Sequence, residues 1–115
     1  MLILYIEDEK SIGIFLKEEL EDEGYDVVVA VCGVEGIRML EEGFIFNNPF
    51  DLVILDIRLP DIDGIELLRK IKERWPKLPV IFHTAYDYYR DNFFRYGDQK
   101  HILLRAAIFR SLKKL

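Results

Sequence analysis

The sequence has few features that could stabilise the protein by disulfides or metal ligands, or anchor it in a membrane. It has one cysteine, Cys32, which cannot form an internal disulfide and has no Cys or His at metal-ligand spacing, so we expect it to be a small buried apolar residue. No apolar run approaches the roughly 18 residues of a membrane span. The first six residues lack the basic leader and cleavage site of a signal peptide. These absences favour a soluble, cytoplasmic protein without a membrane partner.

The chain also lacks an excess of basic residues. Its net charge is −5, which argues against a broad phosphate-binding face and therefore against direct contact with nucleic acid. The charge is unevenly distributed, because residues 1–89 hold 9 Lys and Arg against 19 Asp and Glu, while residues 90–115 hold 7 against 2. The last part of the chain thus differs in character from the part before it.

With 115 residues and half of them hydrophobic, the chain is long enough for one domain, which we expect to cover residues 1–115. Short apolar segments alternate with segments of helical periodicity, and this alternation predicts a doubly wound α/β fold with a five-stranded parallel sheet and helices on both faces. The expected strands are 2–6, 26–31, 52–55, 80–82 and 102–104, and the expected helices are 11–23, 33–42, 65–75, 86–96 and 106–115.

Three of these strands are followed directly by side chains that can do chemistry. The run 52–55 leads into Asp56, the first strand leads into Glu7 and Asp8, and Thr84 follows shortly after the fourth strand. Ligands of open α/β sheets bind at the carboxyl ends of the strands, so we expect the three carboxylates to meet there. Each pair of them would repel by about 4 kcal/mol at 4 Å and an effective dielectric constant near 20. Such a group must take up a proton or hold a cation.

Oxygen-only ligands of this kind suit Mg²⁺ better than zinc or copper. A cation there would also neutralise an incoming phosphoryl group, which Asp56 could accept as an acyl phosphate. Simpler interpretations exist for each residue alone. Asp56 could be a turn former, Glu7 and Asp8 could favour the positive end of a helix, and Thr84 could cap one. Their coincidence after three strands favours the chemical interpretation.

Together, the apolar strand into Glu7-Asp8-Glu9, the motif from Val53 to Gly64 and the segment from Val80 to Asp87 resemble the receiver domain of two-component response regulators. The resemblance covers residues 2–94 and is specific as a set. It implies a flavodoxin-like sheet of order 2-1-3-4-5. It also implies that the chain accepts a phosphoryl group from a sensor histidine kinase or phosphotransfer protein, and signals by protein contact rather than acting as an enzyme.

The resemblance assigns roles to individual residues. Asp56 resembles the phosphoacceptor, and Thr84 the hydroxyl that contacts the phosphoryl group and moves on activation. Glu7, Asp8 and Asp56 would hold Mg²⁺ or Mn²⁺ together with the backbone carbonyl of Arg58. A downstream partner would bind the face formed by the fourth helix, fifth strand and fifth helix.

The tail departs from the family pattern. Receivers carry a Lys at the end of the fifth strand, followed by Pro or Ser, with an aromatic residue three positions earlier; Arg105-Ala106 and Ile102 stand here instead. Arg105 could pair with a phosphoryl group, but its planar guanidinium is no substitute for a compact ammonium, and it could equally be an exposed residue at a helix start. A displaced reading frame near Arg95 is one hypothesis for this tail, and sequencing the gene for a single-base insertion or deletion would test it.

Other functions stay open on sequence grounds. A degenerate receiver could bind partners independently of phosphorylation, which the missing Lys and aromatic residue would favour. A small phosphohydrolase needs a second Asp two positions after the nucleophile, where Arg58 stands. A flavin carrier needs a Ser-, Thr- or Gly-rich phosphate loop where the chain has Glu7-Asp8-Glu9, so a phosphate would be repelled there.

Overall fold

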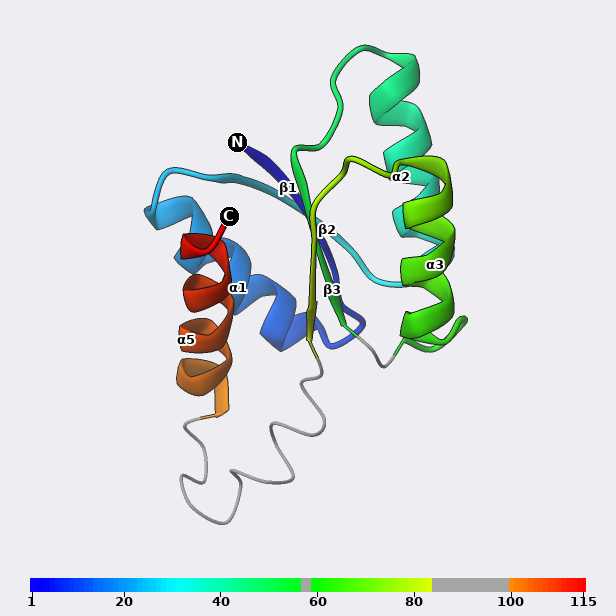
Figure 1. Ribbon diagram of the computed structural model, residues 1–115. Coiled ribbons are helices and arrows are strands. Elements are labelled where there is room, and N and C mark those ends of the chain that lie inside the picture. Colours follow the sequence, from blue (N-terminus) through cyan, green and yellow to red (C-terminus); the bar gives the residue numbers. More distant parts are fainter. Residues whose placement is uncertain (57–58, 84–99) are drawn as a thin grey trace.

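The computed structural model describes residues 1–56, 59–83 and 100–115, and its parallel strands form a sheet in the order β2-β1-β3-β4 (Figure 1). The order agrees with the flavodoxin-like prediction as far as four strands. The elements are β1 (Leu2–Ile6), α1 (Lys10–Asp22), β2 (Asp26–Ala30), α2 (Gly33–Ile45), β3 (Leu52–Asp56), α3 (Gly64–Arg74), β4 (Val80–His83) and α5 (Lys100–Lys113).

The two central strands are the most buried elements. Every residue of β3 is buried, as expected for an unbroken apolar run with helices on both sides. In the register of β1 and β3, Tyr5 lies opposite Ile54 and Ile6 opposite Leu55. The chain segments that leave these two strands therefore start at the same edge of the sheet.

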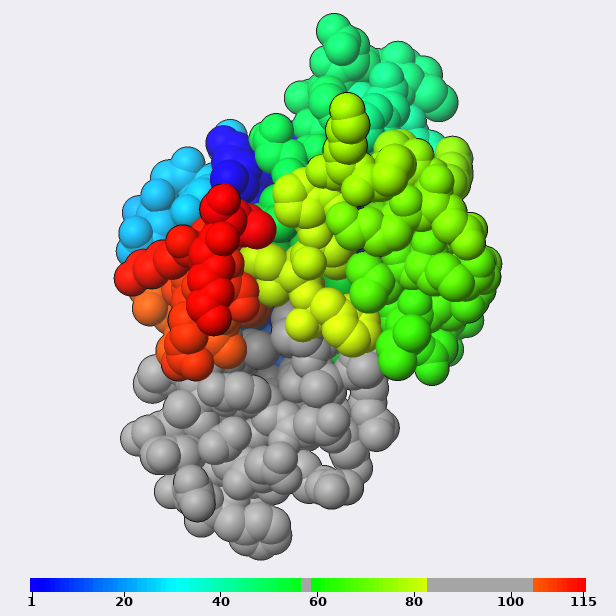
Figure 2. Space-filling model, viewed as in Figure 1, coloured from blue at the N-terminus to red at the C-terminus, as the bar shows by residue number. Residues whose placement is uncertain are grey.

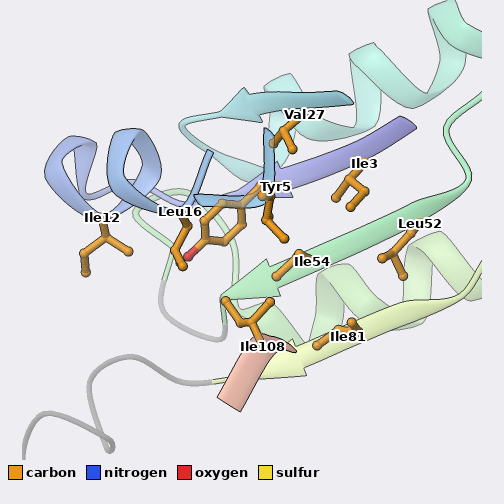
Figure 3. Close-up of a cluster of buried hydrophobic side chains, with 10 residues drawn as sticks. Ile3, Tyr5, Ile12, Leu16, Val27, Leu52, Ile54, Ile81 and Ile108 are labelled. Atoms are coloured by element: carbon orange, nitrogen blue, oxygen red, sulfur yellow. The ribbon is translucent and has the colours of Figure 1, made fainter. Parts of the chain in front are cut away.

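Helices cover both faces of the sheet, α1 and α5 on one and α2 and α3 on the other (Figure 1). Alternate residues of the strands point to opposite faces, so Ile3, Tyr5 and Ile54 pack with α1 and α5, as Figure 3 shows. Leu4, Ile6 and neighbouring β3 residues pack with the other helix pair. Full burial of one such side chain contributes about 1.5–3 kcal/mol. These two cores fix the positions of the strand ends.

The fifth strand predicted over 102–104 is wrong, because these residues belong to α5. A three-residue apolar run cannot be distinguished from part of a buried helix by its periodicity. Further along α5, Ile108 is buried in the core, with Phe109 and Leu112 packed against it. Figure 2 shows this helix beside the β4 segment at the surface. The helix predicted over 86–96 lies outside the described residues.

The end of α2 also differs from the prediction. The helix continues through Gly43 to Ile45, and the left-handed residue after it is Asn47, with φ 56°. Gly43 is there for space: the amide of Asn48 donates to its carbonyl oxygen, and a Cβ at Gly43 would lie 3.0 Å from the Asn48 oxygen. By contrast, Gly24 after α1 has φ 95°, the left-handed conformation that glycine commonly adopts after the end of a helix.

Several large apolar side chains are exposed, among them Val34 (70%) at the start of α2 and Ile65 (59%) at the start of α3. Leu115 lies beyond α5 and Phe46 at the end of α2, and both are also exposed. Cys32 is partly exposed rather than buried. The spacing of apolar residues predicts which face of a helix packs on the sheet. It does not predict where the core ends, and apolar residues near the ends of a helix can lie outside it. Within the described residues, no helix has the length and apolar character needed to cross a membrane.

Candidate functional site at the acidic edge of the sheet

Three carboxylates meet at the carboxyl ends of β1 and β3. One oxygen each of Glu7, Asp8 and Asp56 lies within 4.8 Å of the others. Glu7 and Asp8 follow the last residue of β1, and Asp56 is the last residue of the neighbouring strand β3. Glu7 is 1% and Asp56 3% exposed, whereas Asp8 is open to solvent. The cluster thus has two buried members and one at the surface.

Glu7 carries the electrostatic cost of this arrangement. Burial, above all, and then the hydrogen bond and negative charge of Asp56 raise the pKa of Glu7 to about 10, and the charge of Asp8 adds to the effect. The hydroxyl of Tyr5, itself fully buried, donates a long hydrogen bond of 3.4 Å to Glu7 Oε1. Among the described residues, Glu7 Oε2 is buried without a hydrogen-bond partner. At neutral pH the metal-free protein therefore holds a proton on Glu7.

A divalent cation fits this cluster. A buried carboxylate oxygen without a partner beside two other carboxylates is a place where positive charge is missing, and a cation would supply it. The donors are all oxygen, and the exposed position of Asp8 leaves room for water, which Mg²⁺ usually keeps in its shell. The sequence prediction that these three residues come together is confirmed by the geometry.

The loop after β3 brings two more carboxylates, which sequence reasoning did not single out. The two oxygens of Asp61 accept hydrogen bonds from the backbone N–H groups of Gly33 (2.9 Å) and Val34 (2.8 Å) in the first turn of α2. Asp63 precedes α3 and accepts from the N–H of Ile65 at 2.8 Å. An Asp directly before an apolar helical pattern is a sequence signal that could have identified Asp63 as a cap. No local signal connects Asp61 with a helix 28 residues earlier.

The other predicted site residues are not all described. Arg58 and Thr84 lie outside the described residues. Arg105 is in α5, where its Nε lies 2.6 Å from Glu19 Oε2 of α1 and its guanidinium stacks over the ring of Phe109. Arg105 therefore forms an ion pair that joins α5 to α1. Lys100 is the first residue of α5.

Comparison with known proteins identifies the family. A sequence model of the response regulator receiver domain matches residues 3–103. The chain belongs to this family. The match extends from β1 through the acidic edge to the start of α5.

Curated relatives of this receiver are bacterial regulators. It is 41% identical over 85 residues to the uncharacterized transcriptional regulatory protein YkoG of Bacillus subtilis, and 38% identical over 85 residues to the alkaline phosphatase synthesis transcriptional regulatory protein PhoP of the same species. Each alignment covers 74% of this chain. It covers 35% of YkoG and 33% of PhoP, so the chain spans about a third of the length of these relatives.

Solved receiver structures have the same fold. A CheY-like receiver domain from Methanospirillum hungatei is 38% identical with a TM-score of 0.66, covering 74% of this chain and 64% of that one. The response regulator TrrA of Thermotoga maritima, solved in complex with Mg²⁺ and BeF, is 36% identical with a TM-score of 0.65, covering 84% and 79%. TrrA has also been solved in complex with the histidine kinase ThkA.

Proposed function

We propose that this receiver accepts a phosphoryl group on Asp56 from a sensor histidine kinase or a phosphotransfer protein, in a reaction that depends on Mg²⁺ or Mn²⁺. The observation that carries the proposal is the cluster of Glu7, Asp8 and Asp56, whose oxygens approach within 4.8 Å at the carboxyl edge of the sheet. The Mg²⁺–BeF complex of TrrA and the TrrA–ThkA complex support it by analogy with a related receiver.

In the proposed reaction, a carboxylate oxygen of Asp56 attacks the phosphorus of a donor phosphohistidine. An O–P bond forms, and the N–P bond breaks with its electron pair going to the donor imidazole. The product is an acyl phosphate on Asp56. A bound Mg²⁺ would supply positive charge to the transferred phosphoryl group. Low solvent exposure of Asp56, at 3%, limits access of water to the reacting carboxylate.

The remaining residues support this chemistry in the proposal. Glu7 gives up its proton when a cation binds, and Asp8 adds a carboxylate at the exposed side of the cluster. The carbonyl of Arg58 and the hydroxyl of Thr84 are proposed as further contacts to the cation and to the phosphoryl group, on the family resemblance alone. A downstream protein would bind the face that includes α5. We propose no role for Arg105 at the phosphoryl group, since its guanidinium already pairs with Glu19.

The test is phosphorylation with acetyl phosphate and Mg²⁺, followed by intact-protein mass spectrometry. We expect the wild type to gain one phosphoryl group and Asp56→Asn to gain none. When EDTA is added before acetyl phosphate, the wild type should not be modified. Asp26→Asn is the matched control. Asp26 is exposed at the start of β2, at the edge of the sheet opposite to the acidic cluster, so this substitution should leave the reaction unchanged. No mass gain in the wild type, or a gain that survives Asp56→Asn, would contradict the proposal.

A further inference from the structure

Asp61 joins two segments of the receiver that are far apart in sequence. Its Oδ1 accepts from the amide of Gly33 and its Oδ2 from the amide of Val34, so one carboxylate binds two of the otherwise unpaired N–H groups that begin α2. Cys32, the residue before this helix, makes no side-chain capping bond of its own. The cap of α2 therefore comes from the loop that follows Asp56.

Close packing strengthens this connection. A Cβ placed on Gly33 would lie 2.3 Å from Ile62 Cγ2 and 3.3 Å from Asp61 Oδ1, so only glycine allows the loop to lie this near to α2. Ile62 also packs against the hydrophobic core on the α2–α3 side of the sheet. The loop is thus attached to α2 by two hydrogen bonds and by van der Waals contact.

The same loop is attached to α3 at its other end. Asp63 caps α3 by accepting from Ile65 N, and α3 begins at Gly64. Since β3 ends at Asp56, only residues 57–63 separate the reacting carboxylate from α3. Residues 61–63 have little freedom once Asp61 is held to α2 and Asp63 to α3, because each residue spans at most about 3.6 Å.

The chemistry of Asp61 agrees with this structural role. Desolvation acts to raise its pKa, but the N–H groups of Val34 and Gly33 more than offset it, and the pKa of Asp61 lies below its ordinary value of 3.8. The positive end of a helix stabilises a carboxylate in the same direction. Asp61 is therefore charged and already bound at neutral pH, and unlike Asp8 it is not free to take a cation.

We propose that Asp61 is a positioning residue, which holds the loop after Asp56 against α2 and thereby sets the affinity of the acidic edge for a divalent cation. The inference rests on the proposed function of that edge. Asp61 acts through the backbone of its loop and does not touch the cation.

The experiment compares two variants that weaken the same helix end. Asp61→Ala removes both the cap of α2 and the attachment of the loop. Glu35→Ala removes another bond at this end, the one that Glu35 Oε2 accepts from Val31 N, and leaves the loop attached. Titration calorimetry with Mg²⁺, and urea unfolding of the metal-free proteins, separate an effect on binding from an effect on folding.

We expect Asp61→Ala to weaken Mg²⁺ binding about tenfold, the lower end of the range for residues that orient metal ligands from outside the first shell. Glu35→Ala should bind Mg²⁺ as the wild type does, although both variants lose stability. Asp61→Asn keeps one acceptor oxygen and should recover part of the affinity. Hydrogen exchange at residues 59–63 should rise in Asp61→Ala and not in Glu35→Ala.

The outcomes are distinguishable from failure of the proposed function. Equal Mg²⁺ affinity in Asp61→Ala and wild type, or an equal loss in both alanine variants, would overturn the positioning role alone. A wild-type receiver without measurable Mg²⁺ binding would overturn the metal site and this inference together.

Discussion

The receiver holds one group of carboxylates at the acidic edge and a second group in the loop that follows Asp56, and the two groups have opposite environments. Glu7 and Asp56 are buried at the acidic edge with Asp8 beside them, and one oxygen of Glu7 has no hydrogen-bond partner among the described residues. Asp61 and Asp63 lie in the next loop, and each accepts from backbone N–H groups at the start of a helix. The residue type is nearly the same, but the environment differs.

The difference shows how to distinguish a carboxylate for chemistry from one for structure. Helix N-termini offer N–H donors and partial positive charge, so Asp61 and Asp63 lower the free energy of the folded state as they stand. The acidic edge instead brings three carboxylates together at two adjacent strand ends, where the backbone hydrogen bond from Glu9 does not offset burial and repulsion at Glu7. The edge therefore raises that free energy until a proton or a cation arrives. A raised pKa at Glu7 and a lowered one at Asp61 express this contrast.

The largest effect should come from removing Asp8, the exposed carboxylate of the acidic edge. Asp8→Ala should reduce Mg²⁺ affinity by at least about tenfold, because a lost ligand should cost no less than a lost outer partner. Asp26→Ala, at the exposed start of β2, should leave the affinity unchanged. Calorimetric titration of both variants with Mg²⁺ measures this, and similar affinities for the two would show that the acidic edge does not bind the cation.

Glu7→Gln tests whether the buried edge destabilises the metal-free fold. The pKa of Glu7 is about 10 in the folded protein against an ordinary value of 4.5, so the folded state holds a proton that the unfolded state loses. Stability should therefore be fully present below about pH 4.5 and fall as the pH rises toward 10, by up to about 1.4 kcal/mol per pH unit.

Glutamine resembles the protonated form and does not titrate, so the slope should be smaller in Glu7→Gln. Urea unfolding in EDTA at pH 6 and pH 8 measures it. A wild type and a variant with the same dependence on pH would contradict the raised pKa, and Glu18→Gln on the exposed side of α1 provides the control.

Asp63→Ala tests how much a helix-capping carboxylate contributes to stability. Loss of the bond to Ile65 N should lower the free energy of unfolding by about 1 kcal/mol, the usual value of a helix N-cap. Chemical denaturation at pH 7 measures this. An unchanged stability would mean that solvent replaces the cap without cost.

The smallest expected effect is the loss, at low pH, of the stability that Asp61 contributes. Because the pKa of Asp61 is lowered in the folded state, its contribution is present above the ordinary value of 3.8 and is lost as the pH falls through the folded value. The wild type should exceed Asp61→Asn in stability at pH 7 by no more than about 1 kcal/mol, and this advantage should shrink at pH 3. An advantage that stays constant or grows in acid would contradict the lowered pKa.

Most of the fold up to β4 was predictable from sequence, because four apolar segments alternate with long helical patterns. The acidic edge was predictable for a related reason: parallel strands end at the same side, so residues after β1 and β3 must meet. The tail was not, since the apolar run 102–104 fits a strand or a helix equally, and the packing of Ile108 and the ion pair of Arg105 with Glu19 accompany the helix.

The order of strands and acidic residues along the chain is enough to place Glu7, Asp8 and Asp56 at one edge of the sheet. The hydrogen-bond partners of each carboxylate depend on how distant segments pack together. Burial and the neighbouring Asp56 raise the pKa of Glu7 and outweigh the backbone hydrogen bond from Glu9, whereas the two N–H donors of α2 outweigh the desolvation of Asp61. Hydrogen-bond partners of this kind are set by distances in space between residues 28 positions apart, and no local pattern of sequence encodes them.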